Sequence, residues 1–487
     1  MSLVLELERE LPTTLAAGRA TTVFCIGICT ATEGPVDALR IEVDGIRHPV
    51  AAFAMPRPDR AAAGHLLRSG FWALVPVQAG EPGETIQLTA VARLSGGGEA
   101  EAQLGQITVV GTGGDRPVLT PPSEVDADTI AVCMATYEPD LRLFSAQVGS
   151  LREQTDARWV CLISDDGSSP KRFAEMAALV GEDPRFVLTR SEQRLGFYGN
   201  FERALGLVPD AVSLIALCDQ DDRWQPDKLA ALRAGLGDAL LVYSDLRLLD
   251  ADGALLRDTL WAGRANNHTS LTSMLVANTV TGAAVLFTRE LLELVLPFPD
   301  TPGFQFHDAW LAVMALTAGH VAYVDRALYG YVQHPGAVFG DVTHGPRDSN
   351  RWAWLRARAG PGPGFVTRWR AAYFHGYLAR AAQAQVALAR CQPRIAPAKR
   401  RALERFLACE HSWSALLWLA LRPARALAGH TETLGSELGL AQGVLWKRLA
   451  IAAARHPHFA PRALRDASAP PPQFFSQRRL RRWRARL

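Results

Sequence analysis

The feature that most constrains the fold of this chain is a long stretch in which short apolar runs alternate with helical patterns. Between residues 129 and 335, runs such as TIAVCMA, WVCLIS and LIALC are separated by segments whose apolar residues recur with helical spacing. Strands that alternate with helices imply βαβ units and a mostly parallel sheet. Ligands of such sheets bind outside the carboxyl ends of the strands, so the polar residues that follow each run are candidates for function.

The regions on either side of this stretch have different patterns. Residues 1–118 contain short alternating segments separated by Gly, Pro and polar turns, which predicts an all-β sandwich. Residues 119–128 are rich in Pro and Asp and are predicted to be a linker to an α/β domain at 129–345. Residues 346–477 are predicted to be a helical region, and residues 478–487 a basic tail.

Composition excludes several classes of protein. A net charge of +3 over 487 residues is too small for a nucleic-acid binder. The seven cysteines have no zinc-ligand spacing, so we expect reduced, buried thiols and a reducing compartment. The acidic start lacks the pattern of a signal peptide, and no apolar stretch reaches the roughly 20 residues of a membrane span. These features predict a cytoplasmic protein.

The basic tail suggests a contact with membranes. It has six arginines in ten residues, and Leu480, Trp483 and Leu487 fall on one helical face. Such a segment can lie peripherally on the anionic inner face of the cytoplasmic membrane. The competing interpretation is a solvated end of the chain, and the sequence leaves both open.

Three aspartates follow the run LIALC, where the letters DQDD place Asp219, Asp221 and Asp222 at the end of a predicted strand. Carboxylates two residues apart can converge on Mg²⁺ or Mn²⁺, which bind carboxylate oxygens together with water and substrate phosphates. The competing interpretation is an acidic loop that caps the next helix, whose start is indicated by Pro226 and Asp227.

Two other predicted strands also end in polar residues. The first ends at Thr136, Tyr137 and Glu138, and the second at Asp165 and Asp166. A carboxylate at such a position can accept the N3 hydrogen of a pyrimidine base, as acidic side chains accept hydrogen bonds from base edges elsewhere. A turn in which Asp caps a backbone amide explains the sequence DDGS equally simply.

Together these stretches resemble the inverting glycosyltransferases of family 2, which have the GT-A fold, a Rossmann-like and mostly parallel sheet. The resemblance covers about residues 129 to 340. It rests on the order and spacing of ATYEPD, SDDGSS, RLGFYGNFERAL, CDQDDRWQPDKL, NTVTGAAVLFTREL, FHDAW and LYGYVQHPG. Within the family, the set is most similar to bacterial rhamnosyltransferases of surface-polysaccharide assembly.

The resemblance implies a metal site and a donor site. Asp219 and Asp221 would form a D-x-D motif, with Asp221 the direct ligand of Mn²⁺ or Mg²⁺. Asp222 would support the ligand without contacting the metal, and His334 would lie near the metal and the diphosphate. The metal would bridge the diphosphate of a nucleotide sugar and neutralise the charge that grows as the bond to the sugar breaks. Asp166 would hold the uracil or thymine ring. Thr136, Tyr137 and Glu138 would surround the nucleoside.

The sequence departs from the family pattern near the metal. Many relatives have arginine before the final QH, where Val332 stands here. The departure puts a phosphate contact from this position in doubt, and Arg194 or Arg347 would have to replace it. Gly282 would let the backbone approach the sugar closely, although a tight turn into a strand also explains a glycine there.

The resemblance also implies a catalytic base. In the family, a carboxylate near the start of a late helix deprotonates the acceptor hydroxyl, and FHDAW places Asp308 there. The competing interpretation is that Asp308 is the N-cap of that helix, and the two roles are compatible. His307 is the neighbour expected to orient it.

The sequence therefore predicts an inverting, metal-dependent glycosyltransferase. Its donor would be a UDP- or dTDP-sugar, such as dTDP-rhamnose, and its acceptor a hydroxyl of a glycan or a lipid-linked glycan. A nucleotidyltransferase is disfavoured because MATYEPD lacks a glycine-rich, basic phosphate loop. A non-catalytic glycan-binding or scaffold protein with the same fold is the main alternative. Phe71 and Trp72 could then stack on a sugar, or form part of the sandwich core.

Overall fold

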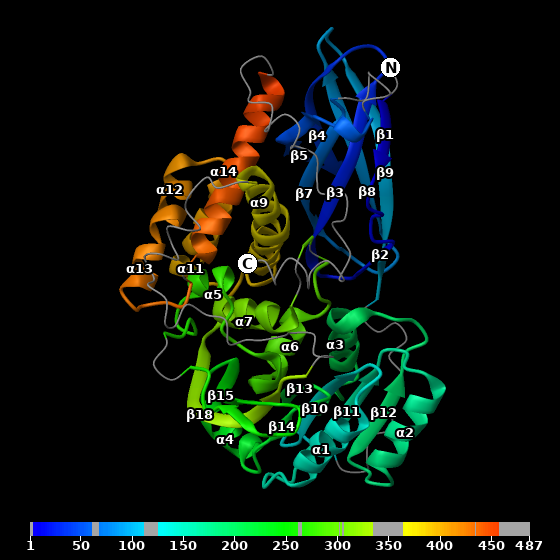
Figure 1. Ribbon diagram of the computed structural model, residues 1–487. Coiled ribbons are helices and arrows are strands. Elements are labelled where there is room, and N and C mark those ends of the chain that lie inside the picture. Colours follow the sequence, from blue (N-terminus) through cyan, green and yellow to red (C-terminus); the bar gives the residue numbers. More distant parts are fainter. Residues whose placement is uncertain are drawn as a thin grey trace.

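The computed structural model describes residues 3–60, 68–111, 125–261, 265–300, 302–303, 306–334, 364–433 and 435–456. Figure 1 shows three parts: a β sandwich, a mixed α/β domain and a group of helices that packs beside both. Most of the predicted linker, the basic tail and Arg347 lie outside the described residues. Among the described helices, none is both long and apolar enough to cross a bilayer.

The N-terminal part is a sandwich of two sheets, which confirms the prediction. One sheet has the order β1 (Leu3–Leu7), β3 (Ala20–Ala31), β7 (Gly70–Gln78) and β6 (Ala52–Met55). The other has the order β2 (Thr14–Ala16), β9 (Glu99–Val110), β8 (Thr85–Leu94), β4 (Val36–Val43) and β5 (Ile46–Val50). Alternating side chains of the two sheets, such as Phe71, Ile41 and Leu88, meet in a buried core. The alternation in the sequence follows from this one-sided burial.

The α/β domain is built on a nine-stranded sheet. Its order is β12 (Phe186–Arg190), β11 (Trp159–Asp165), β10 (Ile130–Thr136), β13 (Leu214–Cys218), β17 (Val285–Thr288), β15 (Leu241–Leu249), β18 (Val321–Val332) and β14 (Arg223–Trp224), with β16 (Leu255–Arg257) paired to β15. The first four strands are parallel, and so are β15 and β18. β17 runs antiparallel between β13 and β15. The predicted mostly parallel sheet is confirmed.

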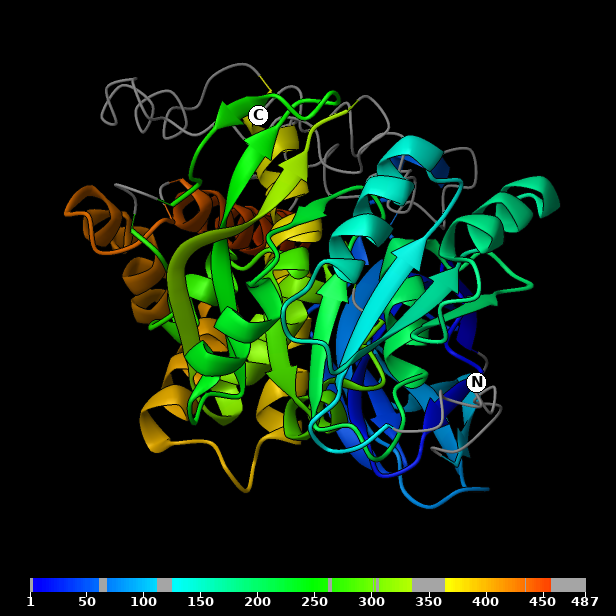
Figure 2. The same ribbon diagram turned by 90° about the horizontal axis from the view of Figure 1, so that it is seen from below.

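Helices cover both faces of this sheet, as Figure 2 shows from below. They are α1 (Leu141–Arg152), α2 (Pro170–Val180), α3 (Gly196–Gly206), α4 (Lys228–Leu236), α5 (Leu271–Val276), α6 (Arg289–Val295) and α7 (His307–Ala318). Every residue of β11 is buried. Burial on both faces explains why the strands are continuous apolar runs rather than alternating ones.

The C-terminal part is helical, as predicted. α9 (Phe365–Ala371), a π-helical segment η4 (Ala372–Tyr377) and α10 (Leu378–Arg390) follow one another without a break. They are followed by α11 (Pro397–Leu407), α12 (Trp413–Leu421), α13 (Pro423–Leu427) and α14 (Ser436–Arg455). All seven cysteines of the chain are free and buried, which confirms their interpretation as small apolar residues.

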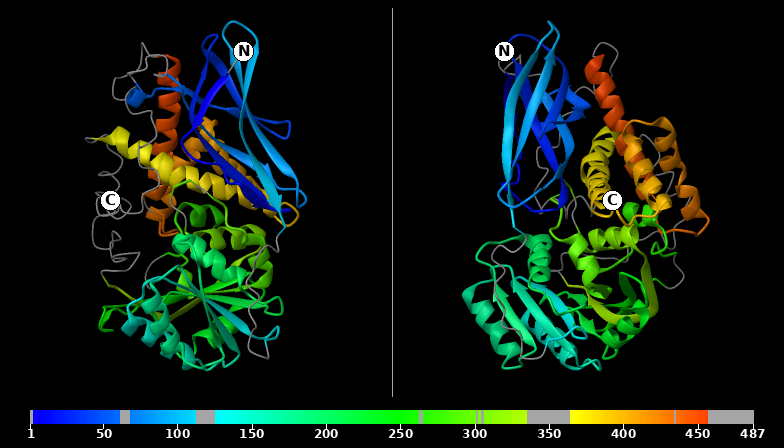
Figure 3. Two further views of the ribbon diagram at one scale, coloured as in Figure 1. Left: turned by 90° about the vertical axis from the view of Figure 1, so that its right-hand side faces the viewer. Right: turned by 180° about the vertical axis from the view of Figure 1, so that it is seen from behind.

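The sandwich is joined to the other two parts by a shared apolar core. Trp72 of β7 stacks on Trp446 of α14 at 6.3 Å between ring centroids and meets Phe374 at 5.2 Å. Arg390 donates hydrogen bonds to Ala20 in the sandwich and to the end of α6. Figure 3 shows the long helix of α9 and α10 lying against the sandwich. Because Phe71 and Trp72 are both buried, their interpretation as an exposed sugar-stacking surface is wrong.

Candidate active site

The predicted site residues of three strands lie at one edge of the sheet. Thr136 at the end of β10 is in register with Asp165 at the end of β11, and β13 ends beside them. Two hydrogen bonds tie these strand ends together. The Tyr137 N–H donates to Gln220 Oε1 at 2.9 Å, and the Asp166 N–H donates to the Thr136 carbonyl at 2.9 Å. The DQDD loop and the first βα turn therefore form one surface.

The metal-side residues are the carboxylates after β13 and the histidine after β18. His334 Nε2 lies 2.8 Å from Asp221 Oδ2, and this bond raises the pKa of His334. Burial raises the pKa of Asp219 to about 7, and the carboxylates of Asp221 and Asp308 add to that shift. Carboxylates of like charge therefore lie close together at this point, and a bound cation would reduce the repulsion between them.

This set of side chains suits Mn²⁺ or Mg²⁺ in an open site. In the described part of the chain, no group of three or more His, Cys, Asp or Glu side chains forms a metal site by itself. Asp221 and His334 are in direct contact, so a carboxylate and an imidazole from distant parts of the chain meet at this point. Mg²⁺ and Mn²⁺ bind in this way, through one or two protein ligands completed by water and substrate phosphates.

Asp222 is buried below this surface together with a lysine that the sequence did not single out. The Val332 N–H donates to Asp222 Oδ1 at 3.3 Å, and burial raises the pKa of Asp222. Lys228 is fully buried, donates to the Ala283 carbonyl, and lies 3.3 Å from the ring centroid of Trp224. Burial lowers the pKa of Lys228 to about 7. Lys228 therefore ties the start of α4 to the segment 282–284.

The nucleotide-side residues Asp166, Arg194 and Tyr137 also lie together. The N–H groups of Leu195 and Gly196 donate to the two Asp166 oxygens at 2.6 and 2.9 Å. The Arg194 guanidinium lies 3.7 Å from the Tyr137 ring centroid, and its Nε is 4.0 Å from Asp166. The Tyr137 ring is exposed, so it is accessible to a ligand.

Thr136 and Glu138 have hydrogen bonds within the protein that the sequence did not reveal. The Thr136 side chain is buried, and its hydroxyl lies 3.3 Å from Asp165 Oδ1. The Glu138 carboxylate accepts a hydrogen bond from the Ser169 N–H at 2.6 Å, which lowers the pKa of Glu138. Glu138 thus stabilises the start of α2. Asp165 accepts from the Ser168 N–H at 2.9 Å, as expected for a capping aspartate.

The predicted base Asp308 lies in the first turn of α7. The N-cap of α7 is Phe306, so the N-cap interpretation of Asp308 is wrong. Asp308 instead accepts a hydrogen bond from the Ala309 N–H at 2.6 Å. Its charge contributes to the raised pKa of Asp219, so the two carboxylates lie near each other. The structure therefore brings the predicted base to the metal side of the site.

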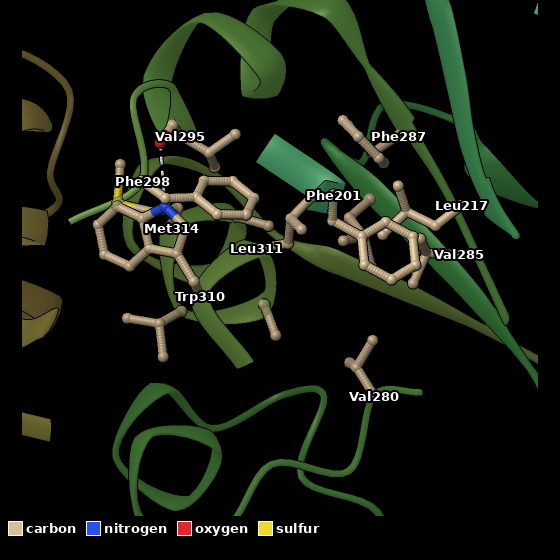
Figure 4. Packing of buried hydrophobic residues seen from close by; sticks show 14 of the residues in the cluster. Phe201, Leu217, Val280, Val285, Phe287, Val295, Phe298, Trp310, Leu311 and Met314 are labelled. Atoms are coloured by element: carbon tan, nitrogen blue, oxygen red, sulfur yellow. Dashed lines mark hydrogen bonds between the residues drawn. The ribbon is translucent and has the colours of Figure 1, made fainter. Parts of the chain in front are cut away.

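His307 points into the core rather than toward Asp308. Its ring stacks on Phe201 with 3.8 Å between centroids, and neither ring nitrogen has a hydrogen bond to a described residue. Burial lowers the pKa of His307 to about 3, so it is neutral. His307 therefore has no hydrogen bond to a described residue through which it could orient Asp308, and its tuning or orienting role stays a prediction. Figure 4 shows Phe201 in the apolar cluster beneath the site, where Trp310 Nε1 donates to the Val295 carbonyl at 3.0 Å.

Gly282 is required by this buried histidine. A Cβ atom at residue 282 would lie 2.4 Å from His307 Nε2, closer than real Cβ contacts. The contact gives a packing reason for the glycine, separate from the predicted approach to a sugar. It joins α7 to the segment that Lys228 also holds.

Comparison with known proteins gives one family match and several distant structural likenesses. Residues 132–260 match the family model described as Glycosyl transferase family 2. The structure of S. aureus TarS 1–349 in complex with UDP-GlcNAc is 13% identical, with 70% of this chain and 89% of that chain covered and a TM-score of 0.39. The mannosyltransferase PcManGT from Pyrobaculum calidifontis, in complex with GDP-Man and Mn²⁺, is 16% identical, with coverages of 68% and 90% and a TM-score of 0.32. No curated protein matches the chain significantly.

Proposed function

We propose that this chain, whose residues 132–260 form a glycosyltransferase family 2 domain, transfers a sugar from a nucleotide-diphosphate donor to a hydroxyl group with inversion at the anomeric carbon. The observation that carries the proposal is the position of Asp219 and Asp221 after β13, where Asp221 contacts His334 and the charge of Asp308 acts on Asp219. The family match covers the first two of these residues and ends before the third. The role of Asp308 is therefore part of the proposal.

On the metal side, Asp221 and His334 would hold Mn²⁺ or Mg²⁺, and Asp219 would lie next to them. The ion would neutralise the charge that develops on the leaving diphosphate. The contact between His334 and Asp221 supports this assignment because it brings two ligands from distant parts of the chain together. Arg194, which lies over the Tyr137 ring near Asp166, would contact the donor from the nucleotide side.

In the transfer step, the acceptor oxygen attacks the anomeric carbon while the bond from that carbon to the diphosphate oxygen breaks. The acceptor proton passes to the Asp308 carboxylate, and the nucleoside diphosphate leaves with the bonding electron pair. Attack from the face opposite the leaving group inverts the anomeric centre. Asp308 is suited to this role because its carboxylate lies near the metal-side residues and is partly accessible.

The donor that we propose is a pyrimidine nucleotide sugar, UDP- or dTDP-linked, with dTDP-rhamnose included. Asp166 supports it because each of its oxygens accepts one chain N–H and keeps a further lone pair for a base N–H. The acceptor would be a glycan or a lipid-linked glycan of a bacterial cell envelope. We also propose that the protein is cytoplasmic and contacts the membrane peripherally through its basic tail.

Calorimetric titration of the purified protein with UDP, dTDP, GDP and CDP, each with Mn²⁺ and with EDTA, tests the donor site. We expect Mn²⁺-dependent binding of UDP or dTDP and at least tenfold weaker binding of GDP. Binding of none of the four would contradict a donor site and favour the non-catalytic scaffold. Binding that is equal with Mn²⁺ and EDTA would contradict the metal site alone.

A further inference from the structure

Helix α12 is apolar on both of its faces. Ala415, Leu416 and Leu419 are buried against the other helices. On the opposite face, Trp413, Leu417 and Leu421 are 66%, 59% and 63% exposed. These three residues are four apart, so they form a row about 12 Å long on one side of the helix. We call Trp413, Leu417 and Leu421 the apolar row.

The apolar row differs from the other exposed apolar residues of the described chain. Ile46, Leu255 and Leu256 are similarly exposed, but they lie singly or as neighbours on strands of the other two parts. Single exposed apolar residues are normal on protein surfaces, whereas a contiguous row indicates a contact surface. Figures 1 and 2 and the right panel of Figure 3 place α12 and α13 at the outer edge of the helical part.

Arginines pack on both tryptophans of α12. The Arg448 guanidinium lies 4.4 Å from the Trp413 ring centroid, and Arg405 lies 4.7 Å from that of Trp418. Residues 397–456 contain nine Lys and Arg against four Glu and no Asp. Two of these glutamates, Glu410 and Glu437, already form ion pairs within the helical part. The net charge of this helical stretch is therefore positive.

Three partners could cover the apolar row: a second copy of the chain, the basic tail or a lipid bilayer. The charge and the apolar residues of this surface favour one of them. A second copy of the chain would bring two arginine-rich surfaces face to face, and like charges oppose such a contact. The basic tail carries six further arginines, so it would meet the same repulsion. An anionic bilayer offers negative head groups for the arginines and an apolar interior for the row, and Trp favours this interface.

We propose that the apolar row of α12 inserts into the interface of an anionic lipid bilayer, with Arg405 and Arg448 contacting the head groups. The proposal concerns a folded helix and does not depend on the basic tail or on which sugar is transferred. It gives the helical part a function of its own, which is to hold the enzyme at a lipid surface.

Flotation of the full chain with vesicles tests the proposal. The vesicles are phosphatidylcholine alone or with about one third phosphatidylglycerol. We expect binding to the anionic vesicles, and at least a tenfold loss of binding in the triple variant Trp413→Ser, Leu417→Ser and Leu421→Ser. The matched control is Ile46→Ser, Leu255→Ser and Leu256→Ser, which removes equally exposed apolar residues and should bind like wild type.

Two further measurements distinguish insertion of the apolar row from binding by the basic tail and from dimerisation. A chain with Leu417→Cys, labelled with an environment-sensitive fluorophore, should show a blue shift with anionic vesicles, since the native cysteines are buried. Deletion of residues 478–487 should leave this shift in place. Full vesicle binding by the triple variant would overturn the proposal. Loss of the fluorescence shift when the tail is deleted would overturn it as well. So would a triple variant that changes from dimer to monomer while its vesicle binding stays unchanged.

Discussion

The two sides of the candidate site differ in how strongly their carboxylates interact with one another. On the nucleotide side, Asp166 and Glu138 accept hydrogen bonds from backbone N–H groups of the chain itself. On the metal side, Asp219 is pushed toward protonation by burial and by its neighbours Asp221 and Asp308. The carboxylates of the first side are stabilised by N–H groups of the chain, whereas on the second side Asp221 and Asp308 oppose the charged form of Asp219.

This difference separates residues that stabilise the folded site from residues that would bind a ligand there. A buried carboxylate with N–H partners contributes to the stability of the folded loop. A group of mutually repelling carboxylates costs stability and is typical of a site for a cation. The metal side should therefore respond to substitution mainly in function, and the nucleotide side in both function and stability.

The largest effect is expected for Asp221→Asn. This substitution removes the charged ligand that faces His334, so kcat/KM for sugar transfer should fall about a thousandfold, with Mn²⁺-dependent donor binding lost. Calorimetry with and without Mn²⁺ and initial rates measure the two effects. Asp252→Asn, at an exposed turn, is the control and should retain activity. Unchanged Mn²⁺-dependent affinity would remove Asp221 from the metal site.

A smaller but selective loss is expected for Asp308→Asn. Without a proton acceptor, kcat should fall by about a hundredfold, the usual scale for a general base. Donor affinity should stay within about twofold, because Asp308 does not contact the donor in the proposed mechanism. Asp238→Asn, on the exposed surface, serves as the control. Near-normal turnover would show that another group accepts the proton.

The packing beneath the metal side is tested by Gly282→Ala. The added methyl group would collide with His307, which should lower the free energy of unfolding by about 1–3 kcal/mol. In a chain that carries His307→Ala, the same substitution should cost much less, because the ring is absent. Denaturant unfolding of the four chains gives this double-mutant cycle. Equal costs in both backgrounds would mean that His307 is not the obstacle.

Two substitutions that each remove one carboxylate charge test the difference between the nucleotide side and the metal side. Asp166→Asn turns an amide NH₂ toward one of two N–H donors, so the free energy of unfolding should fall by about 1–2 kcal/mol. Asp219→Asn, measured without metal, should cause no loss, because it relieves repulsion. Thermal unfolding in EDTA compares the two. Equal destabilisation by both would contradict the distinction between the two sides.

The positions of the main site residues could be predicted because they follow continuous apolar strands. β10, β11 and β13 are recognisable as buried parallel strands, and the carboxyl ends of such strands share an edge. The sequence alone therefore places Asp166 and Asp219 near one another. The sequence order did not predict that β17 lies between β13 and β15, because its antiparallel insertion depends on a long-range pairing.

The support of the site could not be predicted, because it depends on contacts between distant segments. Lys228 appears in the sequence as part of an ordinary helix start, PDKL, and nothing there indicates burial. It is buried because Trp224, Tyr329 and the carbonyl of Ala283 surround it. The contact between Gly282 and His307 is equally long-range, and neither residue type signals the other.

The stacking of Trp72 on Trp446 has a consequence for biosynthesis. The sandwich is synthesised before the helical part, so Trp72 leaves the ribosome well before Trp446, which covers it. At about 5–20 residues per second, roughly 20 to 75 s separate the synthesis of these two tryptophans. Throughout that interval the nascent sandwich carries an apolar face without its partner, which makes it a substrate for chaperones and sensitive to premature termination.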